Sequence, residues 1–204
     1  MDNPFEPLRT HYPKYDVMHE QEHWDEHTRE IVVKRFDLPV TFSQLTGAEV
    51  ECIRALTALF VDDSRLKLLD YVVKHYDSKL ASTIGEDQRK AGTPPEKVLI
   101  RDGLAALETL AQSEYSHSFT ALSPERQTAL LVGLERDTLT LQTPVGTKLP
   151  APEFFKKMLT ESVSAYYSHP LVWSEIGYGG PAYPRGYVRS EFGLTDPWEA
   201  KRDA

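Results

Sequence analysis

The chain has 204 residues, a length at which one well-packed domain is expected. Its formal net charge of -8, without a stripe of basic residues, argues against a general nucleic-acid-binding protein, because such proteins need basic surface to displace counterions. One cysteine cannot form an internal disulfide framework or a cysteine-based metal cluster, and no apolar run approaches the ~18 residues that predict direct membrane insertion.

Residues 1–19 are predicted to form an extended arm, because they are punctuated by proline and show no hydrophobic period. They lack the basic and then apolar pattern of a secretory signal, and they lack a twin-arginine pair. The chain as written is therefore expected to be cytoplasmic, and periplasmic only if it is exported with a partner.

Apolar residues at three- and four-residue spacings predict helices across residues 20–168. A first helix is expected over residues 20–36. Thr46 and Glu49 have capping-box spacing at the start of a second helix, which is expected to end near Val61. Further helix starts are predicted at Ser64, at Thr93-Pro94-Pro95-Glu96 with proline at the first helical position, at Ser123-Pro124 and at Pro152.

Three features of this region bear on its packing. Gly103 in mid-helix costs about 1 kcal/mol relative to alanine, which is tolerable if another helix crosses closely there. Residues 137–150 are predicted as a loop, because the one strand that Leu139 and Leu141 suggest cannot form a sheet by itself. Cys52 is interpreted as a small packing residue.

Residues 162–189 form the most distinctive stretch, rich in tyrosine, glycine and proline and without a regular period. The last long helix is expected to stop at His169-Pro170, since a residue before proline is pushed out of the helical region. Tyrosine and tryptophan offer large apolar faces with polar tips, as at protein interfaces. Two interpretations stay open: an arm folded back over the chain's own helices, or a surface that faces a partner.

Together these elements predict an all-α protein with a single domain of five or six helices. The predicted helical core covers residues 20–168. Aromatic arms rich in proline and glycine are expected to flank it at residues 1–19 and 169–204.

Two patterns resemble catalytic or cofactor motifs. His19-Glu20-Gln21-Glu22-His23 matches the H-E-x-x-H of zinc hydrolases, but it lies at a frayed helix start without apolar flanks, so a solvated polar face is favoured and a zinc-dependent hydrolase is kept as an alternative. The run from Gly177 to Ala182 fits G-x-G-x-x-A, yet Pro181 and Pro184 prevent a regular helix start. It is interpreted as backbone that passes close to another group. His169 is expected to form a hydrogen bond within a packed turn.

The distinctive stretch continues into a second short motif. It reads A-Y-Y-S-H-P-L-V-W-S-E-I-G-Y-G-G-P-A-Y-P-R-G-Y-V-R and is followed by D-P-W-E-A. This combination resembles the C-terminal signature of the gluconate 2-dehydrogenase subunit 3 family. The similarity extends to Y-D-V, W-D-E-H-T-R-E-I-V-V-K-R-F, L-T-G-A-E-V, D-G-L-A-A-L and F-T-A-L-S-P-E-R-Q, so it covers most of the chain.

The resemblance implies a non-catalytic small subunit that binds, stabilises or helps mature a large FAD-containing flavoprotein of the glucose-methanol-choline oxidoreductase type. In that family the large subunit oxidises an alcohol group of a sugar, sugar acid or glycoside, and often passes electrons to a cytochrome or another acceptor. No catalytic residue, cofactor or metal is then expected in this chain. Many relatives carry a twin-arginine signal and escort their partner through export; the missing signal puts that escort role in doubt.

The aromatic arms are the expected contact surface for the flavoprotein. Trp173, Tyr178 and Tyr187 are predicted as anchors, and Arg185 and Arg189 as polar contacts, since buried aromatic and arginine residues dominate many interfaces. A regulatory or scaffold protein with other partners is the alternative. The full predicted set is Tyr166, Tyr167, His169, Pro170, Trp173, Ile176, Gly177, Tyr178, Gly179, Gly180, Arg185, Tyr187 and Arg189.

Overall fold

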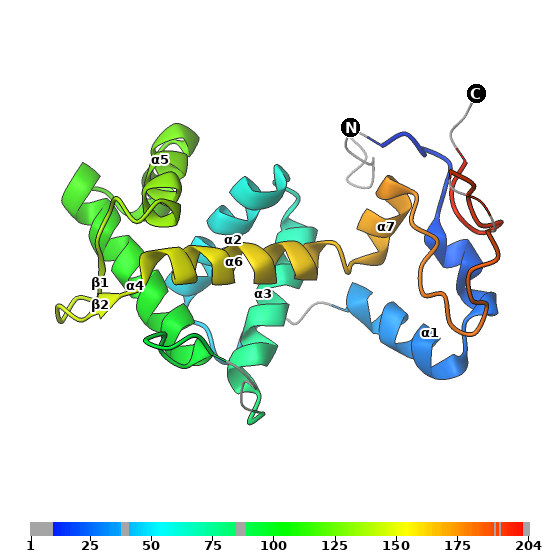
Figure 1. The fold of residues 1–204 in the computed structure, drawn as a ribbon, viewed down its shortest axis with the longest axis horizontal. Coiled ribbons are helices and arrows are strands. Elements are labelled where there is room, and N and C mark those ends of the chain that lie inside the picture. The colour runs from blue at the N-terminus through cyan, green and yellow to red at the C-terminus, as the bar shows by residue number, and fades with distance from the viewer. Residues whose placement is uncertain (1–9, 38–40, 85–88, 190, 192, 202–204) are drawn as a thin grey trace. The chain divides into compact units, whose positions relative to one another are not determined.

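The computed structural model describes residues 10–37, 41–84, 89–189, 191 and 193–201. These residues are mostly helical, which confirms the predicted all-α class (Figure 1). The chain groups into two compact units, and each is described by itself. The central unit is Pro39–Ala165, and the terminal unit combines Met1–Leu38 with Tyr166–Ala204. The predicted limits of the core and arms stay a prediction, and residues 1–9 of the N-terminal arm lie outside the described residues.

The helices of the central unit follow the order of the sequence (Figure 1). They are α2 Gly47–Val61, α3 Leu66–Ala81, α4 Glu96–Tyr115, the 3-10 turn η3 Phe119–Ala121, α5 Pro124–Glu135 and α6 Ala151–Tyr166, which ends at the first residue of the terminal unit. Within the described ranges, none of the helices combines the length and hydrophobicity needed to span a bilayer.

Local capping signals explain some of these helix starts. The predicted capping box is confirmed: Glu49 N–H donates to Thr46 Oγ1 at 3.3 Å, and Thr46 N–H donates to Glu49 Oε2 at 2.8 Å. Pro124 occupies the first helical position of α5, as predicted.

Two predicted helix starts were wrong. Ser64 does not cap α3: Arg65 is the N-cap residue and makes no side-chain cap. The α4 helix begins only at Glu96, with Pro95 as its N-cap, so neither proline of the pair takes the first helical position.

The loop prediction for residues 137–150 missed a short hairpin. Strands β1 Leu141–Gln142 and β2 Lys148–Leu149 pair antiparallel, with Leu141 opposite Leu149. Both leucines are buried, and β1 lies against α4. The turn closes at Gly146, whose φ of 85° suits glycine. A second strand therefore supplied the partner that the sequence pattern did not reveal.

Buried polar groups in the central unit are hydrogen-bonded to one another. The phenol of Tyr76 donates to the Met158 carbonyl at 3.0 Å and lies 3.1 Å from Ser162 Oγ, which also accepts from Thr57 at 3.3 Å. These contacts join α2, α3 and α6 inside the core. Cys52 is buried, which confirms the packing interpretation, and burial raises the pKa of its thiol to about 12.

Gly103 marks a close approach of α4 and α6. A Cβ placed at this glycine would lie 2.1 Å from Cδ2 of the Phe154 ring. Phe154 is itself buried, so the ring has little room to move. The predicted close crossing at Gly103 is confirmed.

A charged cluster joins the surfaces of α3, α4 and α6. Glu161 lies 2.8 Å from His75 Nε2 and 3.0 Å from Lys79 Nζ. Lys79 also reaches Glu96 at 2.9 Å, and Lys157 reaches the same oxygen at 2.8 Å. The hydrogen bond from His75, opposed by burial and aided by Lys79, lowers the pKa of Glu161 from 4.5 to about 2.

The close crossing predicts the effect of a methyl group at Gly103. Alanine normally stabilises a helix interior relative to glycine by about 1 kcal/mol. Here the added Cβ meets Phe154, so Gly103→Ala should lower the free energy of unfolding by roughly 1 to 3 kcal/mol in urea titrations. Gly47→Ala is the control, because nothing lies within 4 Å of its added Cβ. Unchanged stability in Gly103→Ala would contradict the close packing.

The Glu161 cluster predicts a loss of stability in acid. The folded pKa lies below the unfolded value of about 4.5, so the stabilisation is present above that pH and disappears as the pH falls towards 2. Wild-type chain should lose about 1 to 2 kcal/mol over this range from Glu161, and Glu161→Gln should lack that part of the loss. Denaturant unfolding at a series of pH values measures it, with exposed Glu135→Gln as the control. Parallel pH curves for wild type and Glu161→Gln would refute the assignment.

Candidate functional site

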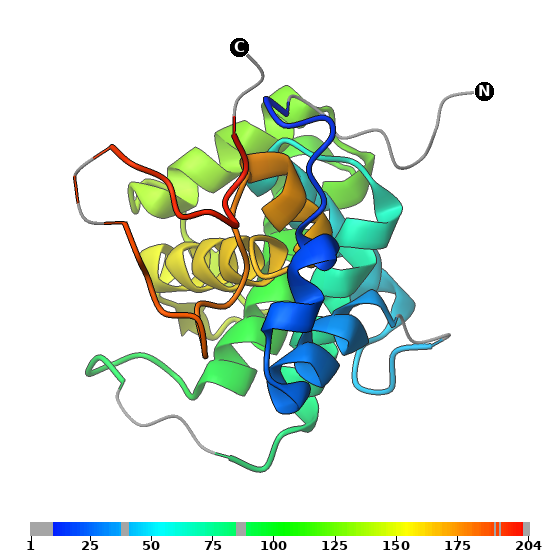
Figure 2. The same ribbon diagram turned by 90° about the vertical axis from the view of Figure 1, so that its right-hand side faces the viewer.

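The terminal unit brings the two ends of the chain side by side (Figures 1 and 2). The N-terminal part contains η1 Val17–His23, α1 Glu26–Val33 and η2 Lys34–Phe36. The single helix predicted over residues 20–36 was wrong, because Asp16 accepts from Met18 N–H and Asp25 from Thr28 N–H, so each caps a separate start. The C-terminal part contains α7 Pro170–Ile176 and irregular chain that continues to residue 201.

The α7 helix corrects the expectation that no regular structure follows His169-Pro170. Pro170 takes the first helical position, and His169 Nδ1 accepts from Leu171 N–H at 3.1 Å as the N-cap. The expected hydrogen bond of His169 within a packed turn is thereby confirmed. The imidazole is buried and meets the ring of Phe36 edge-on, with centroids 5.2 Å apart. The same proline restriction that separates His169 from α6 suits the start of a new helix.

Trp173 of α7 lies in the core of the terminal unit. Its ring packs with Val17, Trp24 and Val32, against which Tyr15 and Met18 also pack. The indole N–H donates to the Tyr167 carbonyl at 2.7 Å. The Arg35 guanidinium lies 5.0 Å from the ring centroid and also donates to the Ser168 carbonyl at 2.6 Å. The N-terminal segments therefore cover the apolar side of α7.

Ser174 ties α7 to the N-terminal segment by hydrogen bonds. Its Oγ accepts from Val17 N–H at 3.0 Å and donates to the Pro170 carbonyl at 3.1 Å. Sequence reasoning missed this residue, because a serine in a short helix carries no signal for a contact 157 residues away.

The glycines after α7 allow aromatic rings to approach the backbone. Gly177 and Gly180 have φ values of 75° and 76°, in the left-handed region. A Cβ at Gly177 would lie 2.6 Å from the Tyr12 ring, and one at Gly180 would lie 2.7 Å from the Trp24 ring. The interpretation of the G-x-G-x-x-A pattern as closely packed backbone is confirmed.

Arg185 fastens the turn to the rest of the terminal unit. Its guanidinium donates to the carbonyls of Gly179 at 2.6 Å and Pro181 at 3.2 Å, and to Glu20 at 3.2 Å. It also lies 4.5 Å from the centroid of the Trp198 ring. The C-terminal tail is held as well, because Tyr15 donates to the Trp198 carbonyl at 2.7 Å. Burial, followed by the nearby charge of Glu20, raises the pKa of Tyr15 to about 12.

The H-E-x-x-H residues lie in the 3-10 helix η1. With about 3.0 residues per turn, this helix does not stack residues four apart as an α-helix does. His19 and His23 are exposed, while Glu20 pairs with Arg185. Among the residues that the structure describes, no group of three or more histidine, cysteine, aspartate or glutamate side chains is arranged to hold a metal ion.

The predicted partner-binding residues divide between the interior and the surface of the terminal unit. Buried members are Tyr166, His169, Pro170, Trp173, Gly179 and Gly180, and Gly177 and Arg185 are half-buried. Exposed members are Tyr167, Ile176, Tyr178, Tyr187 and Arg189. Tyr183 and Val188 belong to the same exposed stretch but were not in the predicted set; the tyrosine-rich composition was the signal for Tyr183.

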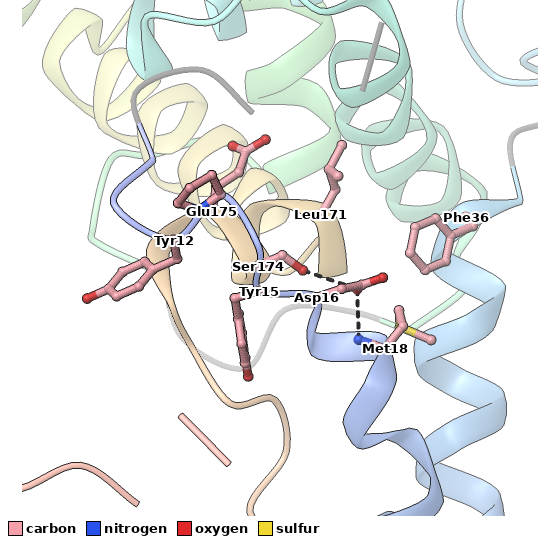
Figure 3. A pocket seen from close by; sticks show the side chains of 9 residues that line it. Tyr12, Tyr15, Asp16, Met18, Phe36, Leu171, Ser174 and Glu175 are labelled. Atoms are coloured by element: carbon pink, nitrogen blue, oxygen red, sulfur yellow. Dashed lines mark hydrogen bonds between the residues drawn. The ribbon is translucent and has the colours of Figure 1, made fainter. Parts of the chain in front are cut away.

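A cavity of about 310 Å³ opens between the N-terminal segment and α7 (Figure 3). Tyr12, Tyr15, Asp16, Met18 and Phe36 come from the N-terminal side, and Leu171, Ser174 and Glu175 from α7. Pro13 completes the lining. The lining is mainly aromatic and apolar, with two carboxylates.

Comparison with known proteins gives one family. No curated protein and no solved structure matches the chain. The family model of gluconate 2-dehydrogenase subunit 3 matches residues 48–180, well over half of the 204 residues. The matched range runs from the first turn of α2 through α7 to the closely packed Gly180. The chain therefore belongs to the gluconate 2-dehydrogenase subunit 3 family.

Proposed function

We propose that this chain is the non-catalytic small subunit that binds and stabilises an FAD-dependent oxidoreductase of the glucose-methanol-choline type. Membership of a family of dehydrogenase subunits implies a larger catalytic partner. In this proposal that partner holds the FAD, oxidises a sugar, sugar acid or glycoside, and passes electrons to a cytochrome or another acceptor. The complex is cytoplasmic unless the partner carries it through export.

The terminal unit supplies the observation that carries the proposal. Large apolar side chains stay exposed on a backbone that is fixed from within: Tyr167 is 46% exposed, Ile176 50% and Tyr187 63%. Tyr178 lies close to Tyr187, since burial and then this neighbouring phenol raise the pKa of Tyr178. Arg189 lies 5.6 Å from the centroid of the Tyr187 ring.

These side chains have the composition of a protein interface. Tyrosine and arginine are enriched at interfaces, and a preorganised backbone lowers the entropic cost of binding. Buried Trp173 supports the surface from inside, while the exposed tyrosines and Ile176 are the contacts proposed for the flavoprotein.

Co-expression tests the subunit role. We expect this chain and the flavoprotein encoded beside it to co-elute in size-exclusion chromatography with flavin absorbance in the shared peak. Omitting this chain should remove most of the soluble flavoprotein, because its contact surface is then left uncovered. Separate elution, with a soluble and active flavoprotein on its own, would contradict the proposal and favour a scaffold with other partners.

Exposed residues allow binding to be tested without damage to the core. The double variant Ile176→Ser/Tyr187→Ala should weaken the complex roughly tenfold or more, because it removes two large contacts. The free energy of unfolding of the isolated variant should change by no more than about 0.5 kcal/mol. Competition with tagged wild-type chain measures the affinity, and urea unfolding measures the stability.

Val145→Ser is the matched control for that variant. Val145 is 88% exposed but lies in the hairpin turn of the central unit, away from the terminal unit's sequence. Its substitution should leave binding unchanged. Equal binding by wild type and Ile176→Ser/Tyr187→Ala would show that these residues are not contacts. Trp173→Ala does not serve this test, since it removes a core side chain and destabilises the whole unit.

A further inference from the structure

The cavity beside α7 has a chemically unusual lining for this chain. The charged side chains among its lining residues are the carboxylates of Asp16 and Glu175 (Figure 3). Aromatic rings come from Tyr12, Tyr15 and Phe36. An anionic ligand would be repelled by this lining, whereas a cation with an apolar stem would match both parts of it.

Asp16 is held in a fixed position at the cavity. One of its carboxylate oxygens, Oδ1, accepts from Met18 N–H at 2.9 Å and from the Ser174 hydroxyl at 3.4 Å. Figure 3 shows the Asp16 side chain between Ser174 and Phe36, with the second oxygen directed away from both donors. Asp16 is exposed, so this carboxylate is accessible to a group that enters the cavity.

The rings provide the apolar part of the cavity. Phe36 is fixed by its edge-on contact with His169, with centroids 5.2 Å apart. Tyr12 packs over Gly177 and is half-buried. The face of an aromatic ring attracts a cation, and the polarisable sulfur of Met18 adds a soft contact for the methylene stem. Arginine and lysine both join a long apolar stem to a cationic head.

We propose that this cavity receives an arginine or lysine side chain of the large subunit. The inference rests on the proposed function for the identity of the partner. Charge complementarity supports it, since the chain carries a net charge of -8 and the cavity adds two carboxylates to an aromatic site. The cavity also adjoins the proposed contact surface, because Glu175 directly precedes the exposed Ile176 in α7.

The test compares dissociation rates of complexes between full-length chain and the co-expressed flavoprotein, chased with excess tagged wild-type chain. Asp16→Asn/Glu175→Gln removes both charges but keeps an acceptor oxygen at each position, including the Asp16 cap. This double variant should dissociate roughly tenfold to hundredfold faster at low salt. The difference should shrink at high salt, because ions screen the attraction that the wild type retains. Phe36→Leu should give a smaller increase, of roughly threefold to tenfold, by removing a ring while keeping apolar volume.

A matched variant separates the cavity from general electrostatics. Glu22→Gln/Glu191→Gln makes the same change in net charge at two exposed positions of the terminal unit outside the lining. Its dissociation rate should stay within about twofold of wild type. An equal increase in both double variants would overturn the cavity proposal, and so would wild-type rates for Asp16→Asn/Glu175→Gln.

The same experiment keeps the two proposals distinguishable. A wild-type complex that forms, with no effect of the cavity variant, leaves the subunit role intact and refutes the cavity's occupant. Failure of the wild-type chain to bind the flavoprotein refutes both. Thermal unfolding of each free variant confirms that a changed rate does not come from an unfolded chain.

Discussion

Trp173 lies in the core of the terminal unit, and contacts of three kinds fix it there. Its ring packs with Val17 and Trp24, its indole N–H donates to the Tyr167 carbonyl, and the Arg35 guanidinium lies over its face. The helix that carries it, α7, has seven residues. Helices this short are not stable in water by themselves, so α7 depends on this burial for its position. The cavity and the exposed tyrosines in turn depend on α7.

The family match and the terminal unit have different boundaries. The match spans residues 48–180 and includes α7, but Val17, Trp24 and Trp198 lie outside it. A helix within the family's range is therefore covered by side chains from both ends of the chain. The terminal unit needs residues 10–37 and the tail around Trp198 together, because each covers a different part of the turn that follows α7.

Burial divides the aromatic stretch into a support and a surface. Tyr166 and Trp173 are inside the terminal unit, whereas Tyr167 and Tyr187 remain exposed. The arginines divide in a similar way: Arg185 is 8% exposed at its side chain and donates to two backbone carbonyls and Glu20, while Arg189 is exposed. A fixed backbone beneath exposed aromatic groups suits recognition of a partner, since little flexibility is lost on binding.

The sequence by itself determined the all-α class, the capping box at Thr46, the start of α5 at Pro124 and the need for a close neighbour at Gly103. These features depend on residues within three or four positions of one another, or on the space that one glycine leaves. The family resemblance likewise came from a continuous run of residues, later matched over residues 48–180.

Only the tertiary structure decided which aromatic rings are buried and which are exposed. Tyr167 and Trp173 have similar surroundings in the sequence, but the N-terminal segment covers one and leaves the other exposed. The cavity has the same origin, since Thr10 and Glu175, which are hydrogen-bonded beside it, are 165 residues apart. Local patterns cannot predict such contacts, because burial depends on which distant segment of the chain packs against each side chain.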